Sequence, residues 1–280
     1  MIRAAALLLL LALPGGRAAA EGLPAVPAAW AAVPGPAPGP PRIHGQTGLG
    51  CIAGAVPLPE TGPGWQAVRL SRNRVWGHPA LVAALRNLAG AAGAQGLPTL
   101  WIGDLGQPRG GPLPYGHASH QVGLDADIWL DLSPKPALSA AARETVAVPS
   151  LVLPDGSDVD PARWTPQHAR LIRLAATLPG LDRIFVNPAI KRALCRSEAG
   201  ADWLRRVRPW RGHDSHMHLR LRCPAGQAAC RDQPPVPAGD GCDASLDWWW
   251  SEEARQPPPR PAPGPPPRLP EACRAVLQAP

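Results

Sequence analysis

The chain has 280 residues and carries 28 lysines and arginines against 21 aspartates and glutamates, which gives a formal net charge of +7. This length suffices for one sizeable core and hardly for two. A basic chain attracts acidic polymers, anionic lipid or nucleic acid. No basic stretch interleaved with aromatic residues is present, so we do not expect nucleic-acid binding. No stretch is apolar for long enough to span a membrane.

Residues 1–20 have the features of a secretory signal peptide. Arg3 supplies a positive start, residues 4–13 form an apolar run too short for a stable membrane anchor, and residues 18–20 are three alanines typical of a cleavage site. The sequence therefore predicts export of a soluble mature protein that begins at Glu21 and remains basic.

Two segments are dominated by proline. Pro and Ala prevail in residues 21–41, and Pro prevails again in residues 257–280. Such segments offer too little apolar surface to order themselves and tend to extended, polyproline-like conformations. We therefore predict one folded domain at residues 42–256 between flexible or surface-draped ends.

Helical patterns alternate with short strands inside this domain. Helices are expected at residues 78–91, 165–177 and 188–194, and the last two have a proline in the first turn. Strands are expected at residues 99–105 and 182–187, and in two segments that contain histidine. The predicted fold class is α+β: a single domain with a small central antiparallel sheet flanked by helices, with Pro-rich ends.

Five of the eight histidines lie in two short clusters, at residues 116–127 and 212–218. Residues 124–132 alternate between apolar and polar, so Asp127 should project from the face of a strand opposite the core. The preceding loop can fold His120 beside Asp127, and His216 and His218 share one face of a second strand. If these strands are antiparallel neighbours, His120, Asp127 and His218 can bind one zinc ion and leave a position for water.

The alternative to a zinc site is that the aspartates lie on a solvated strand face and that the histidines are structural and hydrogen-bonded. Five histidines in two windows, with a carboxylate in phase with the strand, make a metal site the better interpretation. His44, His78 and His168 stand alone and are expected to be structural. The chain contains no HExxH, GxSxG or SxxK motif.

Six cysteines lie in the mature chain, and none forms a CxxC pair. An even number in an exported chain favours disulfides over metal thiolates or a thiol nucleophile. Their pairing is open from the residues alone, although Cys223 with Cys230 is the local pair, and Cys51 with Cys273 could join the two ends.

Four strings of residues carry a resemblance to a known family: GHASHQVGLDADIW, RIFVNPAIK, VRPWRGHDSHMHLRLRCP and DQPPVPAGDGC. They resemble the penicillin-insensitive murein endopeptidase (MepA) family, within the superfamily of lysostaphin-type, D-Ala-D-Ala and hedgehog-type zinc peptidases. The resemblance covers essentially the whole mature domain. It implies a periplasmic zinc endopeptidase that cleaves the D-alanyl to meso-diaminopimelyl cross-link of peptidoglycan and is insensitive to penicillin.

The resemblance also implies roles for individual residues. It assigns zinc to His120, Asp127 and His218, and it associates His117 with further metal binding. It assigns His216 and His213 to catalysis. The disulfides that it implies are Cys51 with Cys273, Cys195 with Cys242, and Cys223 with Cys230.

Zinc would polarise the scissile carbonyl and lower the pKa of a bound water, and a histidine near pKa 6.5 suits the proton transfer. Asp125 and Asp214 could orient a histidine, or could simply face solvent. Arg220 and Arg222 share the predicted histidine face and could bind carboxylates of the peptide stem. The alternative is that both arginines face solvent and bind no substrate.

Three other functions remain open at this point. A zinc carboxypeptidase or dipeptidase could use the same metal site to release D-Ala. A non-catalytic, metal-stabilised wall-binding module and a structural envelope protein anchored by its Pro-rich ends are more distant alternatives. The expected partner is cross-linked peptidoglycan, with no nucleic acid and no membrane span.

Overall fold

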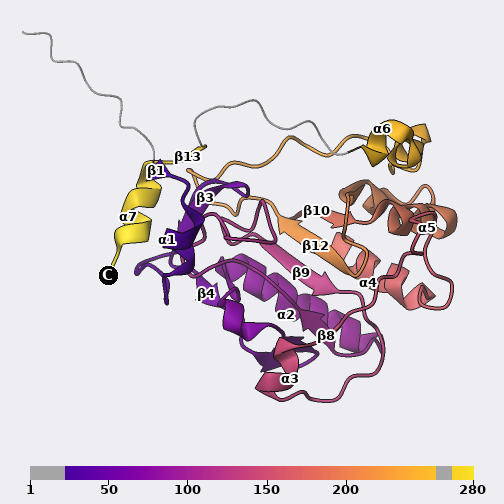
Figure 1. Cartoon of the computed structure of the whole chain (residues 1–280), viewed down its shortest axis with the longest axis horizontal. Helices are drawn as coiled ribbons and strands as arrows, with labels where there is room; N and C mark the ends of the chain where they lie inside the picture. Colours follow the sequence, from indigo (N-terminus) through magenta and orange to yellow (C-terminus); the bar gives the residue numbers. More distant parts are fainter. Residues whose placement is uncertain (1–22, 257–266) are drawn as a thin grey trace, which may run out of the picture.

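The computed structural model describes residues 23–256 and 267–280, so the predicted signal peptide lies outside the described residues. Its centre is a seven-stranded sheet with the strand order β11-β10-β12-β9-β8-β6-β5 (Figure 1). The strands are β5 (Thr61–Gly62), β6 (Trp65–Ala67), β8 (Leu100–Ile102), β9 (Asp125–Trp129), β10 (Leu181–Val186), β11 (Val207–Pro209) and β12 (His216–Leu221). Among the described residues, no helix is long and apolar enough to cross a bilayer.

The fold mixes α and β structure as predicted, but the sheet is larger than expected and is not purely antiparallel. Strands β10, β12, β9 and β8 pair antiparallel, whereas β6 pairs with β8, and β10 with β11, in parallel. Parallel neighbours need a crossover connection. In the chain, the connection from β6 to β8 contains helix α2 (Pro79–Ala94), and the connection from β10 to β11 contains helix α5 (Pro188–Glu198).

The three predicted helices are confirmed, and their starts follow the capping rules. α2, α4 (Pro166–Ala176) and α5 each begin with proline directly after the N-cap residue. His78 accepts a hydrogen bond from the backbone N–H of Ala80 at 3.1 Å. His168 accepts from the N–H of Thr165 at 3.0 Å and bonds the Leu130 carbonyl at 2.9 Å. Both histidines are therefore structural, as expected.

The remaining elements are short. They are β1 (Leu23–Pro24), α1 (Pro27–Ala31), β2 (Arg42–Gln46), β3 (Leu49–Ala53), β4 (Val56–Pro57), η1 (Leu70–Arg72), β7 (Trp76–Gly77), α3 (Ala140–Glu144), η2 (Asp202–Arg206), η3 (Ala244–Trp250), α6 (Glu252–Arg255), β13 (Arg268–Leu269) and α7 (Ala272–Gln278). The main core lies between the sheet and α2, α4 and α5.

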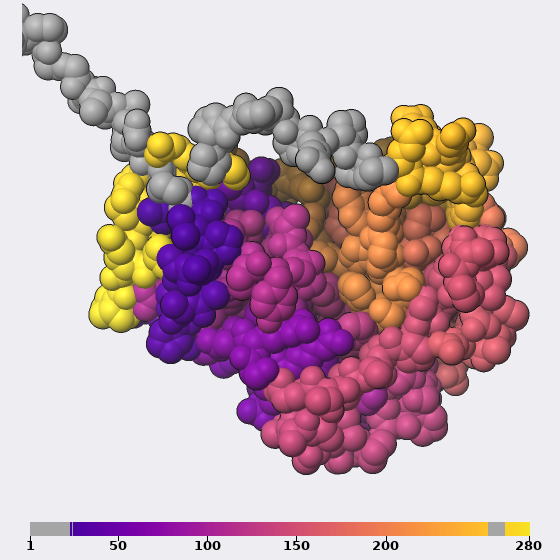
Figure 2. Space-filling view, viewed as in Figure 1, coloured from indigo at the N-terminus to yellow at the C-terminus, as the bar shows by residue number. Residues whose placement is uncertain are grey.

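The described parts of the Pro-rich ends pack against each other. Strand β1 pairs with β13, and Trp30 is 1% exposed in a second small core that includes Leu269 and Val276. The space-filling view shows the N-terminal residues directly against the C-terminal helix (Figure 2). Composition missed this core because a few apolar side chains, the largest being Trp30, supply the buried surface that the prolines lack. The domain boundaries themselves stay predictions.

All three disulfides have the pairing that the family resemblance implied. Cys51–Cys273, Cys195–Cys242 and Cys223–Cys230 join residues separated by 222, 47 and 7 positions. All six cysteines lie within the described residues, and none of them is free. The first disulfide holds α7 against β3 and therefore closes almost the whole described chain into one loop.

The loop lengths predict unequal contributions to stability. In the chain-entropy model, replacing Cys51 and Cys273 together by alanine should lower the free energy of unfolding by about 5 kcal/mol. The matched replacement of Cys223 and Cys230 should lower it by about 2 kcal/mol, because its loop is short. Urea unfolding followed by tryptophan fluorescence measures both values. Equal losses for the two pairs would contradict the loop-closure explanation.

Candidate metal centre

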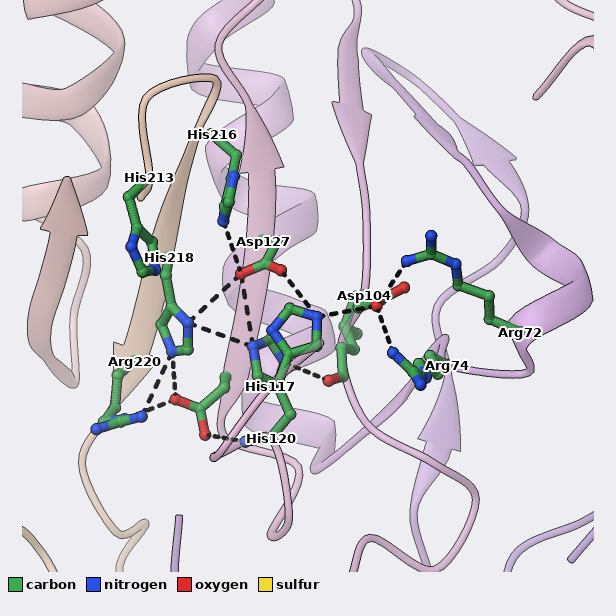
Figure 3. A network of polar contacts seen from close by, with 12 residues as sticks. Arg72, Arg74, Asp104, His117, His120, Asp127, His213, His216, His218 and Arg220 are labelled. Carbon is green, nitrogen blue, oxygen red and sulfur yellow. Dashed lines mark hydrogen bonds and ion pairs between the residues drawn. The ribbon is translucent and has the colours of Figure 1, made fainter. Parts of the chain in front are cut away.

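The two histidine clusters meet where β9 and β12 pair. The strands are antiparallel, His218 lies directly opposite Asp127, and His216 lies opposite Trp129. Their alternate residues Ala126, Ile128, Met217 and Leu219 are fully buried in the core. The side chains of Asp127, His216 and His218 therefore share the other face of the sheet, where the loop before β9 brings His117 and His120 (Figure 3).

Three acceptor atoms converge at this point. The distances are 3.3 Å from His120 Nε2 to His218 Nδ1, 3.5 Å from His120 Nε2 to Asp127 Oδ1, and 3.4 Å from His218 Nδ1 to Asp127 Oδ1. Ligands of a tetrahedral ion with bonds of about 2.0–2.1 Å stand about 3.3–3.4 Å apart. Asp127 Oδ1 is buried and has no hydrogen-bond partner among the described residues. The three atoms therefore stand as far apart as three ligands of one tetrahedral metal ion.

Hydrogen bonds fix which nitrogen of each ring faces the triangle. His120 Nδ1 bonds the Leu105 carbonyl, and His218 Nε2 bonds Asp125 Oδ1 at 2.7 Å. Each of these nitrogens must carry the proton to donate, so His120 Nε2 and His218 Nδ1 present lone pairs to Asp127. When both rings are neutral, two lone pairs and a carboxylate oxygen repel one another unless a proton or a metal ion lies between them.

The electrostatics of the triangle also favour a cation. Burial lowers the pKa of His218 to about 4, which keeps that ring neutral, as a metal ligand must be. Burial lowers the pKa of His120 as well, but the Asp127 carboxylate raises it to above its ordinary value. Although burial raises the pKa of Asp127, His120 holds it well below the usual range. Asp127 is therefore a buried anion.

Asp125 links the parts of the site. It is fully buried, its Oδ1 accepts from His218 and from Arg220 Nε at 2.6 Å, and its Oδ2 accepts from the His120 backbone N–H at 3.3 Å. His120 has φ 66°, in the left-handed region that non-glycine residues avoid, and this N–H bond helps to hold it there. Asp125 thus orients both histidines, whereas Asp214 contacts no histidine ring among the described residues and lines a separate hollow.

The two arginines expected on the histidine face are separated. Arg220 is buried, and besides Asp125 it bonds Gln233 Oε1 at 2.6 Å through its Nη1. Strand β12 ends at Leu221, so Arg222 lies beyond the strand, where its Nε is 3.7 Å from Asp182 Oδ1. Arg222 is not among the residues that line the groove over the site.

Sequence reasoning missed the Asp104 network. Asp104 follows β8, and its Oδ2 accepts from Arg72 at 3.0 Å, Arg74 at 2.8 Å and His117 Nε2 at 3.0 Å. Burial raises the pKa of Asp104, but these partners lower it to about 2. His117 Nε2 is also 3.5 Å from Asp127 Oδ2. The ligand atoms of His117, His120 and Asp127 all lie within 4.8 Å of one another and could hold a metal ion.

Two further histidines flank the triangle. His216 Nε2 is 3.9 Å from Asp127 Oδ1, its ring packs on Trp129, and its Nδ1 is buried without a partner among the described residues. His213 Nδ1 bonds the Arg211 carbonyl at 2.9 Å, and its ring lies 4.9 Å from that of His216. Burial lowers the pKa of His213.

A groove of about 560 Å³ opens over the site. Its lining residues are Gln46, Thr47, Gly48, Gly116, His117, Ala118, Ser119, Arg183, Phe185, Trp210, Arg211, His213, His218, Arg220 and Gln233. The His and Asp cluster can hold a metal ion, two of its histidines, His117 and His218, line the open groove, and two more histidines lie beside it. This is the arrangement of a metal-dependent hydrolase.

Comparison with known proteins defines the family. The model of the family described as penicillin-insensitive murein endopeptidase matches residues 43–278. A protein of that name from Klebsiella pneumoniae subsp. pneumoniae is 45% identical over 267 residues, which cover 93% of this chain and 94% of the relative. Those from Yersinia enterocolitica and Salmonella arizonae are 46% identical over 250 residues, 89% of this chain and 90% of each relative. The chain belongs to the penicillin-insensitive murein endopeptidase family and is a peptidase.

The contacts of Asp125 predict a weaker metal site when its charge is removed. Asp125→Asn should lower the affinity for zinc about 10- to 100-fold, because groups that orient metal ligands typically contribute that much. Asp214→Asn is the matched control and should leave the affinity unchanged. Titration of zinc in competition with a chromophoric chelator measures both dissociation constants. An unchanged affinity in Asp125→Asn would show that the two histidines do not need this carboxylate.

Proposed function

We propose that this chain is a periplasmic zinc endopeptidase that hydrolyses the D-alanyl to meso-diaminopimelyl cross-link of peptidoglycan. The convergence of three acceptor atoms at 3.3–3.5 Å, one of them from His218 in the lining of a groove, carries the proposal. Relatives of 45–46% identity are named penicillin-insensitive murein endopeptidases. The three disulfides suit an oxidising compartment, which agrees with export through residues 1–20.

The donor set suits zinc. His120, Asp127 and His218 would hold it, because zinc binds imidazole nitrogens and carboxylate oxygens. The three atoms are also spaced like neighbouring ligands of a tetrahedral ion. His117 would lie outside this coordination shell, because Asp104 already binds its Nε2, and it stays a candidate for further metal binding. When bound, zinc supplies Lewis-acid polarisation of the scissile carbonyl and lowers the pKa of a water.

The two flanking histidines would handle the proton. His213 donates from Nδ1 to the Arg211 carbonyl, so its Nε2 is free to accept a proton, and its lowered pKa keeps it neutral at neutral pH. His216 lies between His213 and Asp127, with its Nε2 toward the carboxylate. We assign to this pair the removal of a proton from the attacking water and the delivery of a proton to the leaving amine.

Cations on the groove wall would bind the stem peptides. Arg183 and Arg211 line the groove together with Arg220. Peptide stems that contain diaminopimelate carry free carboxylates, and a guanidinium binds a carboxylate through two parallel hydrogen bonds. Arg220 is committed to Asp125, so we assign it to positioning, and we expect Arg211 to meet the substrate.

Substitution separates metal ligands from proton carriers. His120→Ala, Asp127→Ala and His218→Ala should each remove bound zinc and activity, because each deletes one of three protein ligands. His216→Ala should retain zinc and lose about two to four orders of magnitude in rate. Metal analysis of the purified proteins, beside the rate on sacculi, tests this. Stoichiometric zinc in the three ligand variants would refute the assignment, and zinc loss in His216→Ala would make His216 a ligand.

The products identify the reaction. Incubation with purified sacculi should convert cross-linked dimeric muropeptides to monomers and leave the glycan strands intact, as mass spectrometry of the digest would show. Penicillin should have no effect, because the chain offers no SxxK serine for it to acylate, whereas a chelator should stop the reaction. Release of D-Ala from monomeric pentapeptide, with dimers left standing, would instead identify a carboxypeptidase.

A further inference from the structure

Three consecutive tryptophans end η3, beside the groove, and the metal centre does not use them. Trp250 is anchored: its Nε1 donates to the Gly156 carbonyl at 3.0 Å, and the Arg192 guanidinium lies 3.2 Å from its ring centroid. Trp248 is 43% exposed. Trp210, on the groove wall, is 54% exposed. Large apolar side chains left in water in this way mark an interaction surface.

The exposed tryptophans belong to one series of ring contacts that starts at the metal centre. The centroid distances are 5.4 Å from His218 to Phe185, 5.7 Å from Phe185 to Trp210, 6.4 Å from Trp210 to Trp249, and 5.2 Å from Trp249 to Trp248. The aromatic surface is therefore continuous with the groove and leads from its floor to the outside of the molecule.

The segment that carries these tryptophans is held in place. The Cys195–Cys242 disulfide ties it to α5. The fully buried Lys191, also in α5, donates to the carbonyls of Leu204 at 2.8 Å and Asp240 at 2.5 Å. The surface is thus presented in a fixed position, which reduces the entropy lost when a ligand binds.

We propose that Trp210, Trp249 and Trp248 form a sugar-binding face for the glycan strand whose stem peptide occupies the groove. The inference rests on the proposed function, because that function places a stem peptide over the metal centre. An extended stem of four residues spans at most about 14 Å, so its glycan must pass close to the groove. Sugar rings expose faces of C–H groups that pack on indole rings without any charge partner. The face therefore matches a neutral polysaccharide that adjoins the groove.

Two substrates separate glycan binding from bond cleavage. One is intact sacculi, and the other is the cross-linked peptide dimer freed from glycan by an amidase. In Trp248→Ala, the ratio of kcat/KM on sacculi to kcat/KM on the free dimer should fall about two- to tenfold, the size of one aromatic contact. Trp248→Phe should restore most of the ratio. Val26→Ala removes an exposed apolar side chain directly before α1, an element that Figure 1 shows well away from α6, and should not change the ratio.

A binding measurement decides the inference independently of catalysis. Zinc-loaded wild-type protein should co-sediment with peptide-free glycan strands, and Trp248→Ala should lose most of this binding while Val26→Ala keeps it. Equal sedimentation of wild type and Trp248→Ala would overturn the sugar-binding face, as would an unchanged ratio of the two rates. If the wild type cleaves neither substrate, the proposed function fails, and sedimentation still decides whether the face binds glycan.

Discussion

The buried carboxylate of Asp125 is the group on which the geometry of the metal centre depends. It lies on β9, yet it binds a ring on β12, the guanidinium of Arg220 and the backbone N–H of His120 in the loop before β9. A charge taken out of water costs several kcal/mol unless partners surround it. Arg220 and the two histidines are these partners, so the same contacts that stabilise Asp125 aim His120 and His218 at Asp127.

The pairing of β9 with β12 fixes the position of His218 relative to Asp127, which Asp125 alone does not do. Direct pairing of His218 with Asp127 across two antiparallel strands brings a nitrogen and an oxygen together without any adjustable loop. His120 completes the triangle from a loop, in a backbone conformation that non-glycine residues rarely adopt. The result is a cluster of acceptors that repel one another while both rings are neutral and that attract a proton or a metal ion. Binding of a cation therefore stabilises the folded state as well as creating the catalytic centre.

The sequence predicted the faces of the two histidine-bearing strands better than it predicted the sheet as a whole. The face occupied by Asp127 could be predicted because side-chain alternation is a local property of a strand. The parallel pairs were missed because they depend on where crossover helices return the chain. Asp104 was missed because a single acid after a three-residue strand looks like any acid that faces solvent. Its partners Arg72 and Arg74 precede it in the chain by a whole crossover connection that includes α2. The core around Trp30 was missed because it joins the two ends of the chain, which no local pattern shows.

X-ray absorption spectroscopy of the zinc-loaded protein tests most directly whether His120, Asp127 and His218 hold one ion. The geometry predicts a first shell of nitrogen and oxygen at about 2.0–2.1 Å, with the multiple-scattering signature of two imidazoles and no sulfur. The spectrum of His117→Ala should be the same, since that histidine is bound by Asp104. A shell with three imidazoles that loses one in His117→Ala, or a shell with a single imidazole, would contradict the triangle as the zinc site.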